Sequence, residues 1–166
     1  MQYHVSLGTS ARVITVITAL LMIGIPIAIL IFMPLMVFSM AILALIVPPL
    51  ILLGCYWYRV TGYQVDANRI TINRLASDVD IPLGKVESID FDPEAMKRSL
   101  KSFGNGGVFG FYGKFWNRKY GRYRAYVTDL NKVVVIRAGG TIYMLSPEQP
   151  EKFIDKIKEK LSGGRN

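Results

Sequence analysis

A chain of 166 residues ordinarily folds as one domain, and this one has a net charge of +8. Its hydrophobic content of 51% is only slightly high for a soluble protein. The distribution of charge excludes that interpretation for the whole chain. No charged residue lies between Val13 and Tyr58, whereas all twelve acidic residues and nineteen of the twenty basic residues follow Tyr58. The composition therefore sets a boundary near Arg59, between residues 1–58 and residues 59–166.

The uncharged segment is long enough to cross a bilayer twice. One membrane span needs about twenty helical residues, and this segment has forty-six. Pro34 stands near its midpoint and can open a second helix, because a first-turn residue needs no amide hydrogen. We predict a two-pass transmembrane hairpin in residues 1–58, with helices at about Arg12 to Phe32 and Leu35 to Tyr58. Three further prolines fall inside these helices, where we expect kinks that the neighbouring helix covers: Pro26, Pro48 and Pro49.

The charges that flank the predicted hairpin indicate its orientation. Arg12 precedes the first helix, Arg59 follows the second, and the turn between them has no charge, so both ends are expected in the cytoplasm. The aromatic residues 56–58 suit the membrane interface on that side. Cys55 is the only cysteine, which excludes an internal disulfide, and we interpret it as a membrane-face residue. The absence of charge within the spans argues against a transporter or a proton pathway.

After Arg59 the hydrophobic pattern changes to a period of two, which is typical of strands. Residues 69–74 alternate in this way, with Ile70 and Ile72 on the expected buried face. Further strands are predicted at residues 79–83, 86–91, 120–128, 132–137 and 141–145. The last two form a hairpin through Ala138-Gly139-Gly140. The pattern predicts an antiparallel meander, interrupted by an irregular or helical stretch at residues 93–102.

A different pattern predicts a C-terminal helix. Ser146, Pro147 and Gln149 suit an N-cap, a first-turn proline and a capping-box acceptor. The apolar stripe that follows consists of Phe153, Ile154, Ile157 and Leu161. Residues 162–164 end the helix. Six or seven short strands with one terminal helix predict a mainly β, partly open barrel, in which the helix covers an exposed opening.

Several of these features occur together in a familiar order. They are the glycine-aromatic segment Gly104 to Gly113, the strand Tyr123 to Thr128 beside residues 131–136, and the closing segments 145–147 and Phe153-Ile154. In this order they resemble the bacterial pleckstrin-homology-like domains of small two-pass membrane proteins, over about residues 58–161. The resemblance implies a pleckstrin-homology-like fold and a location in the bacterial inner (cytoplasmic) membrane. Eukaryotic members of the broader fold bind inositol phospholipids between their first strands, where this sequence has only Arg69 and Arg74.

Residues 95–128 contain no acidic residue, eight basic residues and many aromatic residues. A basic residue near an anionic leaflet contributes about 1 kcal/mol, and aromatic rings settle at headgroup depth. We therefore predict a lipid- or partner-binding surface here. Its candidate residues are Lys97, Arg98, Lys101, Lys114, Trp116, Arg118, Lys119, Arg122 and Arg124. A second interpretation stays open, in which the aromatic residues fill the barrel core and the basic residues are only solvated.

Catalysis, a cofactor and a metal ion are not expected. His4 is the only histidine and lies outside the domain, and Cys55 lies in the predicted membrane segment, so the soluble part offers no His-based triad and no Cys/His metal site. Residues 104–110 lack the third glycine of a dinucleotide loop and the Lys-Ser/Thr of a P-loop, and we interpret them as a flexible loop. An RNA-recognition strand motif also matches poorly, so nucleic acid is not an expected partner.

The sequence thus predicts a non-catalytic, membrane-anchored scaffold or adaptor that presents a basic, aromatic-rich face to anionic lipid or to an acidic partner. The alternative is a regulatory or assembly subunit of a membrane protein complex, which acts through protein contacts or oligomerisation. Charge reversal at Arg118, Lys119, Arg122 and Arg124 distinguishes the two, because only the first requires these charges for binding to anionic lipid.

Overall fold

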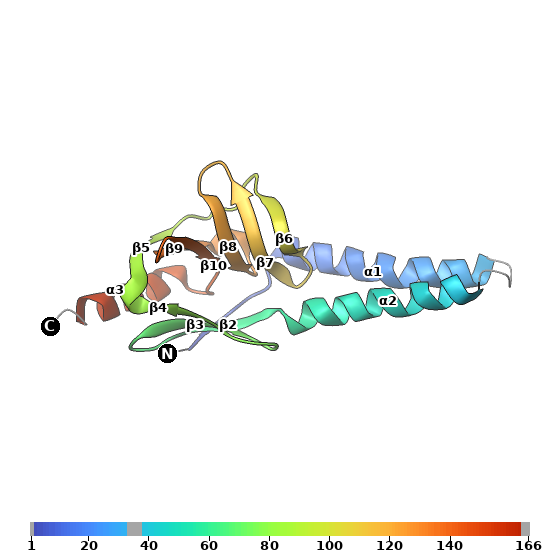
Figure 1. Cartoon of the computed structure of the whole chain (residues 1–166), viewed down its shortest axis with the longest axis horizontal. Coiled ribbons are helices and arrows are strands. Elements are labelled where there is room, and N and C mark those ends of the chain that lie inside the picture. Colours follow the sequence, from blue (N-terminus) through green and yellow to red (C-terminus); the bar gives the residue numbers. More distant parts are fainter. Residues whose placement is uncertain (1, 33–37, 164–166) are drawn as a thin grey trace.

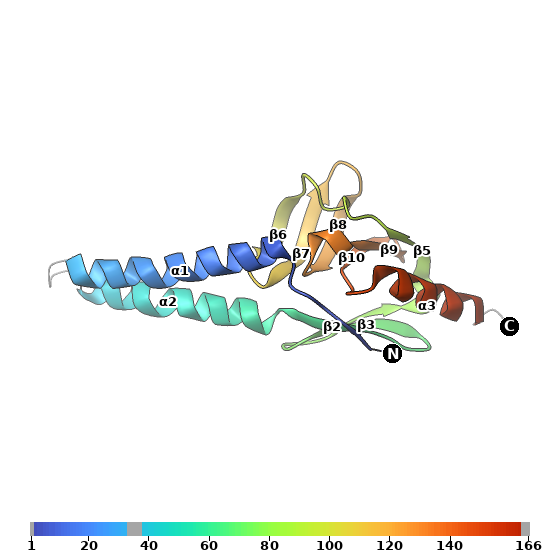
Figure 2. The ribbon, with the colours of Figure 1, turned by 180° about the vertical axis from the view of Figure 1, so that it is seen from behind.

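The computed structural model describes residues 2–32 and 38–163, in which two long helices project from a β domain (Figure 1). The helices are α1 (Thr9–Phe32) and α2 (Phe38–Trp57). They lie side by side, as the views from the front and from behind both show (Figures 1 and 2). The predicted turn at Pro34 falls outside the described residues. Pro26 is buried, and it lines a hollow between the helices together with Pro48. Pro26 is therefore covered, whereas Pro48 is half-buried and Pro49 is exposed, so the expected covering holds only for Pro26.

Only one helix meets the length and composition of a membrane span within the described residues. This span is Thr9–Ile29 of α1, and very little of it is buried inside the molecule. In α2, the described apolar stretch Leu45–Trp57 is shorter. The apolar character of α1 indicates membrane association.

The first sheet contains four antiparallel strands in the order β1-β2-β3-β4. These strands are β1 (Gln2–His4), β2 (Val60–Val65), β3 (Arg69–Arg74) and β4 (Val79–Pro82). The prediction for residues 69–74 is confirmed, since Ile70 and Ile72 are completely buried. Strand β1 was not predicted. It joins the sheet from the segment before α1, so residues on both sides of the helical pair belong to one sheet.

The second sheet contains six strands in the order β5-β9-β10-β8-β7-β6. These strands are β5 (Val86–Phe91), β6 (Leu100–Gly107), β7 (Gly110–Asn117), β8 (Gly121–Val127), β9 (Val134–Ala138) and β10 (Thr141–Leu145). The predicted hairpin of β9 and β10 is confirmed. The simple antiparallel meander is wrong, because β10 pairs in parallel with β8. Val134, Val135 and Ile136 are all buried, as an interior strand covered on both faces requires.

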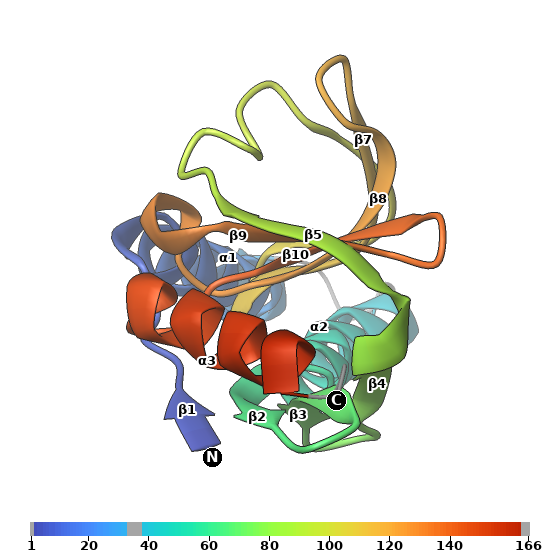
Figure 3. The same ribbon diagram turned by 90° about the vertical axis from the view of Figure 1, so that its left-hand side faces the viewer.

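Helix α3 (Pro150–Gly163) lies between the two sheets on one open side of the domain (Figure 3). Its residues Phe153, Ile154 and Ile157 are buried in the core that the two sheets share, which confirms the predicted apolar stripe. The sheets remain separate and do not close into a continuous barrel. A second core lies on the other face of the six-stranded sheet and includes Ala95, Phe115 and Tyr123. Part of the aromatic content is therefore structural.

The predicted N-cap at Ser146 is wrong, because this side chain belongs to the core. Its hydroxyl accepts hydrogen bonds from the amides of Thr128 (2.7 Å) and Asp129 (3.2 Å). Its own amide donates to the Tyr63 hydroxyl (3.0 Å), which in turn donates to the carbonyl of Tyr126 (2.6 Å). Burial raises the pKa of Tyr63 to about 12, so the hydroxyl keeps its proton. Tyr63 thereby ties the first sheet to the second.

Candidate functional site

The hairpin of β6 and β7 is built on two glycines that face each other. Gly104 (φ 119°) pairs with Gly113 (φ 129°), and both adopt a conformation that residues with a side chain rarely reach. A Cβ on Gly104 would lie 2.2 Å from the carbonyl oxygen of Tyr112, and one on Gly113 would lie 2.2 Å from that of Phe103. The prediction of a flexible loop at residues 104–110 is wrong, because only Val108 and Phe109 form the turn.

The tip of this hairpin lies against both long helices. The amide of Phe109 donates to the Thr15 hydroxyl of α1 (2.8 Å), and its ring packs edge-on against Tyr56 of α2, with ring centroids 5.6 Å apart. The hydroxyl of Tyr112 donates to the backbone carbonyl of Cys55. Burial raises the pKa of Tyr112 to about 12, which keeps this donor protonated. These contacts hold β6 and β7 at the base of the helical pair.

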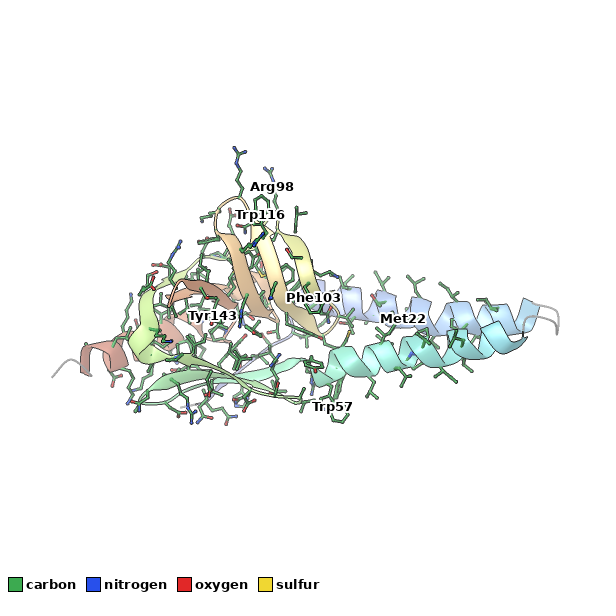
Figure 4. All side chains as sticks on the ribbon, in the orientation of Figure 1. Met22, Trp57, Arg98, Phe103, Trp116 and Tyr143 are labelled. Atoms are coloured by element: carbon green, nitrogen blue, oxygen red, sulfur yellow. The ribbon has the colours of Figure 1, made fainter. Side chains whose placement is uncertain are left out.

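Strands β6, β7 and β8 run across the helix axis and away from it, and β6 lies nearest α1 among these three strands (Figures 1 and 4). Strand β6 is also an edge strand, with no further strand beyond it in the sheet. Its residues Leu100 and Phe103 are 65% and 76% exposed. Large apolar side chains with this exposure, beside an apolar helix, make this strand a candidate interaction surface.

The register of these three strands brings basic and apolar side chains onto one face. Phe103 pairs with Lys114, and Lys114 with Arg124. Leu100 pairs with Trp116, and Trp116 with Arg122. Paired residues on neighbouring strands point to the same side, so the six side chains share one surface. We call it the β6–β8 face: Leu100, Phe103, Lys114, Trp116, Arg122 and Arg124.

Three cations of this face line one hollow of about 480 Å³. They are Lys114, Arg122 and Arg124, and the hydroxyl residues Ser102 and Thr141 line the same hollow. Within the residues that the structure describes, none of the three cations forms an ion pair. Cationic donors with hydroxyl groups around a shallow hollow suit a phosphate or another anion.

Two of the predicted site residues are held in ion pairs. Lys97 contacts Glu94, and Lys119 lies 2.6 Å from Asp92, whose hydrogen bond raises the pKa of the lysine. Partial burial opposes ionisation of Asp92, but hydrogen bonds from Lys119, Tyr120 and the amide of Glu94 outweigh it and lower the pKa of Asp92. These two lysines therefore contribute less free positive charge than the sequence suggested.

The other predicted residues lie apart from the hollow. Arg98 and Arg118 are exposed in the outer turns, and Arg98 adopts a positive φ of 53° (Figure 4). Lys101 lines a different hollow beside α2, with Arg74. Leu100 and Phe103 were not predicted, because no strand was assigned to residues 100–107. Leu100 and Phe103 are three residues apart, so the sequence shows no strand alternation here, and the two residues share a face only because of the bulge between Lys101 and Phe103.

The two packed sheets with one C-terminal helix define a pleckstrin-homology-like domain, a class whose members are generally non-enzymatic modules that bind lipid or protein. A family model for the bacterial PH domain matches residues 61–161, so the chain belongs to this family. The predicted family resemblance is confirmed for this domain. No curated protein and no solved structure matches the chain. Within the described residues, no group of three or more His, Cys, Asp or Glu side chains could hold a metal ion.

Proposed function

We propose that this protein is a two-pass membrane scaffold or adaptor whose PH-like domain rests on the membrane surface through the β6–β8 face. In this proposal α1 and α2 both cross the bacterial inner membrane, and both termini are cytoplasmic. Residues 1–58 are mainly anchor, and residues 59–166 form the domain. The partner of the face is the anionic headgroup layer of the membrane that holds the anchor.

The pairing of β1 with β2 supports an even number of crossings. Strand β1 precedes α1 and β2 follows α2, yet Tyr3 pairs with Tyr63 in one sheet. Two segments of one sheet must lie on the same side of a membrane. The twenty residues of α2 carry no charge and extend about 30 Å as a helix, which is the thickness of a hydrocarbon core.

The observation that carries the proposal is the exposure of large apolar side chains beside unpaired cations on β6–β8. Leu100 and Phe103 are mostly exposed, and Trp116 is 43% exposed. Lys114, Arg122 and Arg124 lie beside them without an acidic partner among the described residues. Each basic residue near an anionic leaflet contributes about 1 kcal/mol, and a tryptophan ring suits the headgroup region.

Such contacts would set the orientation of the domain, because the anchor already supplies localisation. An anchored domain meets the membrane at high effective concentration, so weak contacts are sufficient to keep one face of the domain turned toward the membrane. The remaining surface, including α3, would then be presented to cytoplasmic partners in a fixed direction.

A second candidate function has its own support in the open edge of β6. An exposed edge strand presents unpaired backbone groups and can add a strand from another chain. The protein would then act as an assembly subunit, through pairing with a second copy or with another membrane protein. This candidate predicts chemical crosslinks between chains at β6 that do not depend on the lipid.

The proposal can be tested by the fluorescence of Trp116 in the full-length protein. The chain has two tryptophans, so Trp57→Phe leaves Trp116 as the only one. In proteoliposomes that contain brominated lipids, Trp116 is expected to be quenched in anionic bilayers, less in neutral bilayers, and less at high salt. The triple variant Lys114→Glu, Arg122→Glu and Arg124→Glu should abolish the quenching.

A control for this test changes the same amount of charge elsewhere. Lys85→Glu, Lys152→Glu and Lys158→Glu alter three exposed lysines outside the β6–β8 face and should leave the quenching as it is. Equal quenching in anionic and neutral bilayers, or quenching that survives the triple reversal, would reject the lipid-facing role. Crosslinks between chains at β6 would in that case favour the assembly subunit.

A further inference from the structure

A second hollow, of about 670 Å³, lies where α2 meets the hairpin of β6 and β7. It shares no lining residue with the hollow on the β6–β8 face. Its walls come from the end of α2, from the end of β3, and from β6, β7 and β8. Its lining includes Ile51, Gly54, Tyr58, Arg74, Lys101 and Phe103.

One side of this hollow is apolar and continues into the surface of α2. Ile51 is 49% exposed and lies nearly two turns before the end of the helix, and Phe103 faces the same space from β6. Gly54 leaves the wall open between them, because a Cβ at this position would meet nothing within 4 Å. The apolar wall therefore has room for a hydrocarbon chain alongside α2.

The other side of the hollow is cationic. Arg74 is held in place by hydrogen bonds to the carbonyl oxygen (2.7 Å) and the hydroxyl (3.0 Å) of Ser77, and its guanidinium lies 5.8 Å from the ring centre of Tyr58. Lys101 is exposed at the same hollow. Over residues 2–32 and 38–163, neither cation has an ion-pair partner. The pair is therefore available to an anionic group.

We propose that this hollow binds a single anionic glycerophospholipid, with its phosphate between Arg74 and Lys101 and an acyl chain along Ile51, Gly54 and Phe103. A soluble anion would use only the cationic side, whereas a membrane lipid uses both sides. The site shares Phe103 with the β6–β8 face but is separate from the hollow of Lys114, Arg122 and Arg124, and it would hold one lipid in a defined position between anchor and domain. The inference rests on the proposed membrane insertion of α2.

Photo-crosslinking in bilayers tests this site on the full-length protein. The probe is phosphatidylglycerol with a diazirine in the acyl chain, present as a minor component of phosphatidylcholine bilayers. Labelled peptides are identified by mass spectrometry, and labelling is expected at residues 51–58 and 100–105. Gly54→Leu fills the hollow and should lower this labelling on the order of tenfold.

The matched control is Gly24→Leu in α1, where an added Cβ also meets nothing within 4 Å. This variant adds the same bulk to the other helix and should leave labelling at residues 51–58 unchanged. Arg74→Gln with Lys101→Gln should reduce labelling by phosphatidylglycerol to the level of the corresponding phosphatidylcholine probe, because both cations are lost.

Two results would overturn the inference. Labelling that persists in Gly54→Leu would show that the acyl chain does not occupy the hollow. Full competition by soluble glycerophosphoglycerol would show that the headgroup alone is recognised. Either result leaves the proposed function standing if the quenching of Trp116 still depends on anionic lipid, so the two failures are distinguishable.

Discussion

Alanine at Gly104 or Gly113 is expected to separate β6 from β7 and to release the β6 edge from the base of the helices. Both glycines have strongly positive φ, and a Cβ at either one would lie 2.2 Å from a backbone carbonyl oxygen of the opposite strand. Such backbone strain alone costs roughly 1–3 kcal/mol, and the clash with a rigid backbone adds to it. Hydrogen exchange of amides 100–117 in the full-length protein should accelerate in both variants.

Gly106→Ala is the matched control in the same strand. Gly106 does not have a positive φ, and the nearest atom to its added Cβ is the flexible Lys101 side chain at 3.4 Å. Its exchange pattern should stay close to that of the native protein. If Gly104→Ala exchanged no faster than Gly106→Ala, the close pairing of the two glycines would not be what holds the hairpin.

The second large effect is expected from Phe153→Ala in α3. Phe153 is completely buried, and its ring lies 5.1 Å from that of Tyr3 and 6.0 Å from that of Tyr63. Removing a buried phenylalanine destabilises a domain by about 3–5 kcal/mol. Because Tyr3 belongs to β1, the loss should free both α3 and the N-terminal strand. Exchange at residues 2–4 and 150–163 is therefore expected to rise together.

Lys158→Ala provides the control on the same helix, because this side chain is exposed. Exposed substitutions of this kind usually change stability by less than about 0.5 kcal/mol. Urea unfolding in detergent gives the free-energy difference between the variants. Equal midpoints for Phe153→Ala and Lys158→Ala would contradict the view that α3 is part of the shared core.

Local patterns were sufficient for the elements that have a sequence signal of their own. The period of two around Ile70 and Ile72 predicted β3, and the apolar stripe through Phe153 and Ile157 predicted α3. Strand β1 and the parallel pairing of β10 with β8 could not be predicted in this way. Each depends on a partner far along the chain, and neither has a sequence signal of its own.

Ser146 shows how a local motif can be overridden by the tertiary structure. Its spacing from Gln149 suits a helix N-cap, but its hydroxyl instead serves the amides of Thr128 and Asp129 in the core. The local pattern contains no information on these distant donors. The prediction of a flexible loop at residues 104–110 was wrong for a related reason. The strand pairing of these glycines depends on a close backbone approach that composition does not reveal.

The sequence predicted a set of charged residues for the candidate site, but not how they are arranged in space. The acid-free window that began at Ala95 excluded Asp92 and Glu94, the partners of Lys119 and Lys97. Strand register then separated Lys101 from Lys114 into different hollows. The number of basic residues predicts that the ligand is anionic, whereas only the fold shows which cations have no ion-pair partner and which of them lie together.

The membrane depth of β6 is the most direct test of the lipid-facing role of the β6–β8 face. A spin label at Phe103→Cys, in a Cys55→Ser background, reports whether residue 103 lies at the headgroup layer of anionic proteoliposomes. A second label at Lys158→Cys reports on α3, at the end of the molecule opposite the helical pair (Figure 1). Oxygen is expected to relax the label at 103 better than a polar reagent does, and the label at 158 is expected to show the reverse. Aqueous accessibility at both positions would contradict the lipid-facing role.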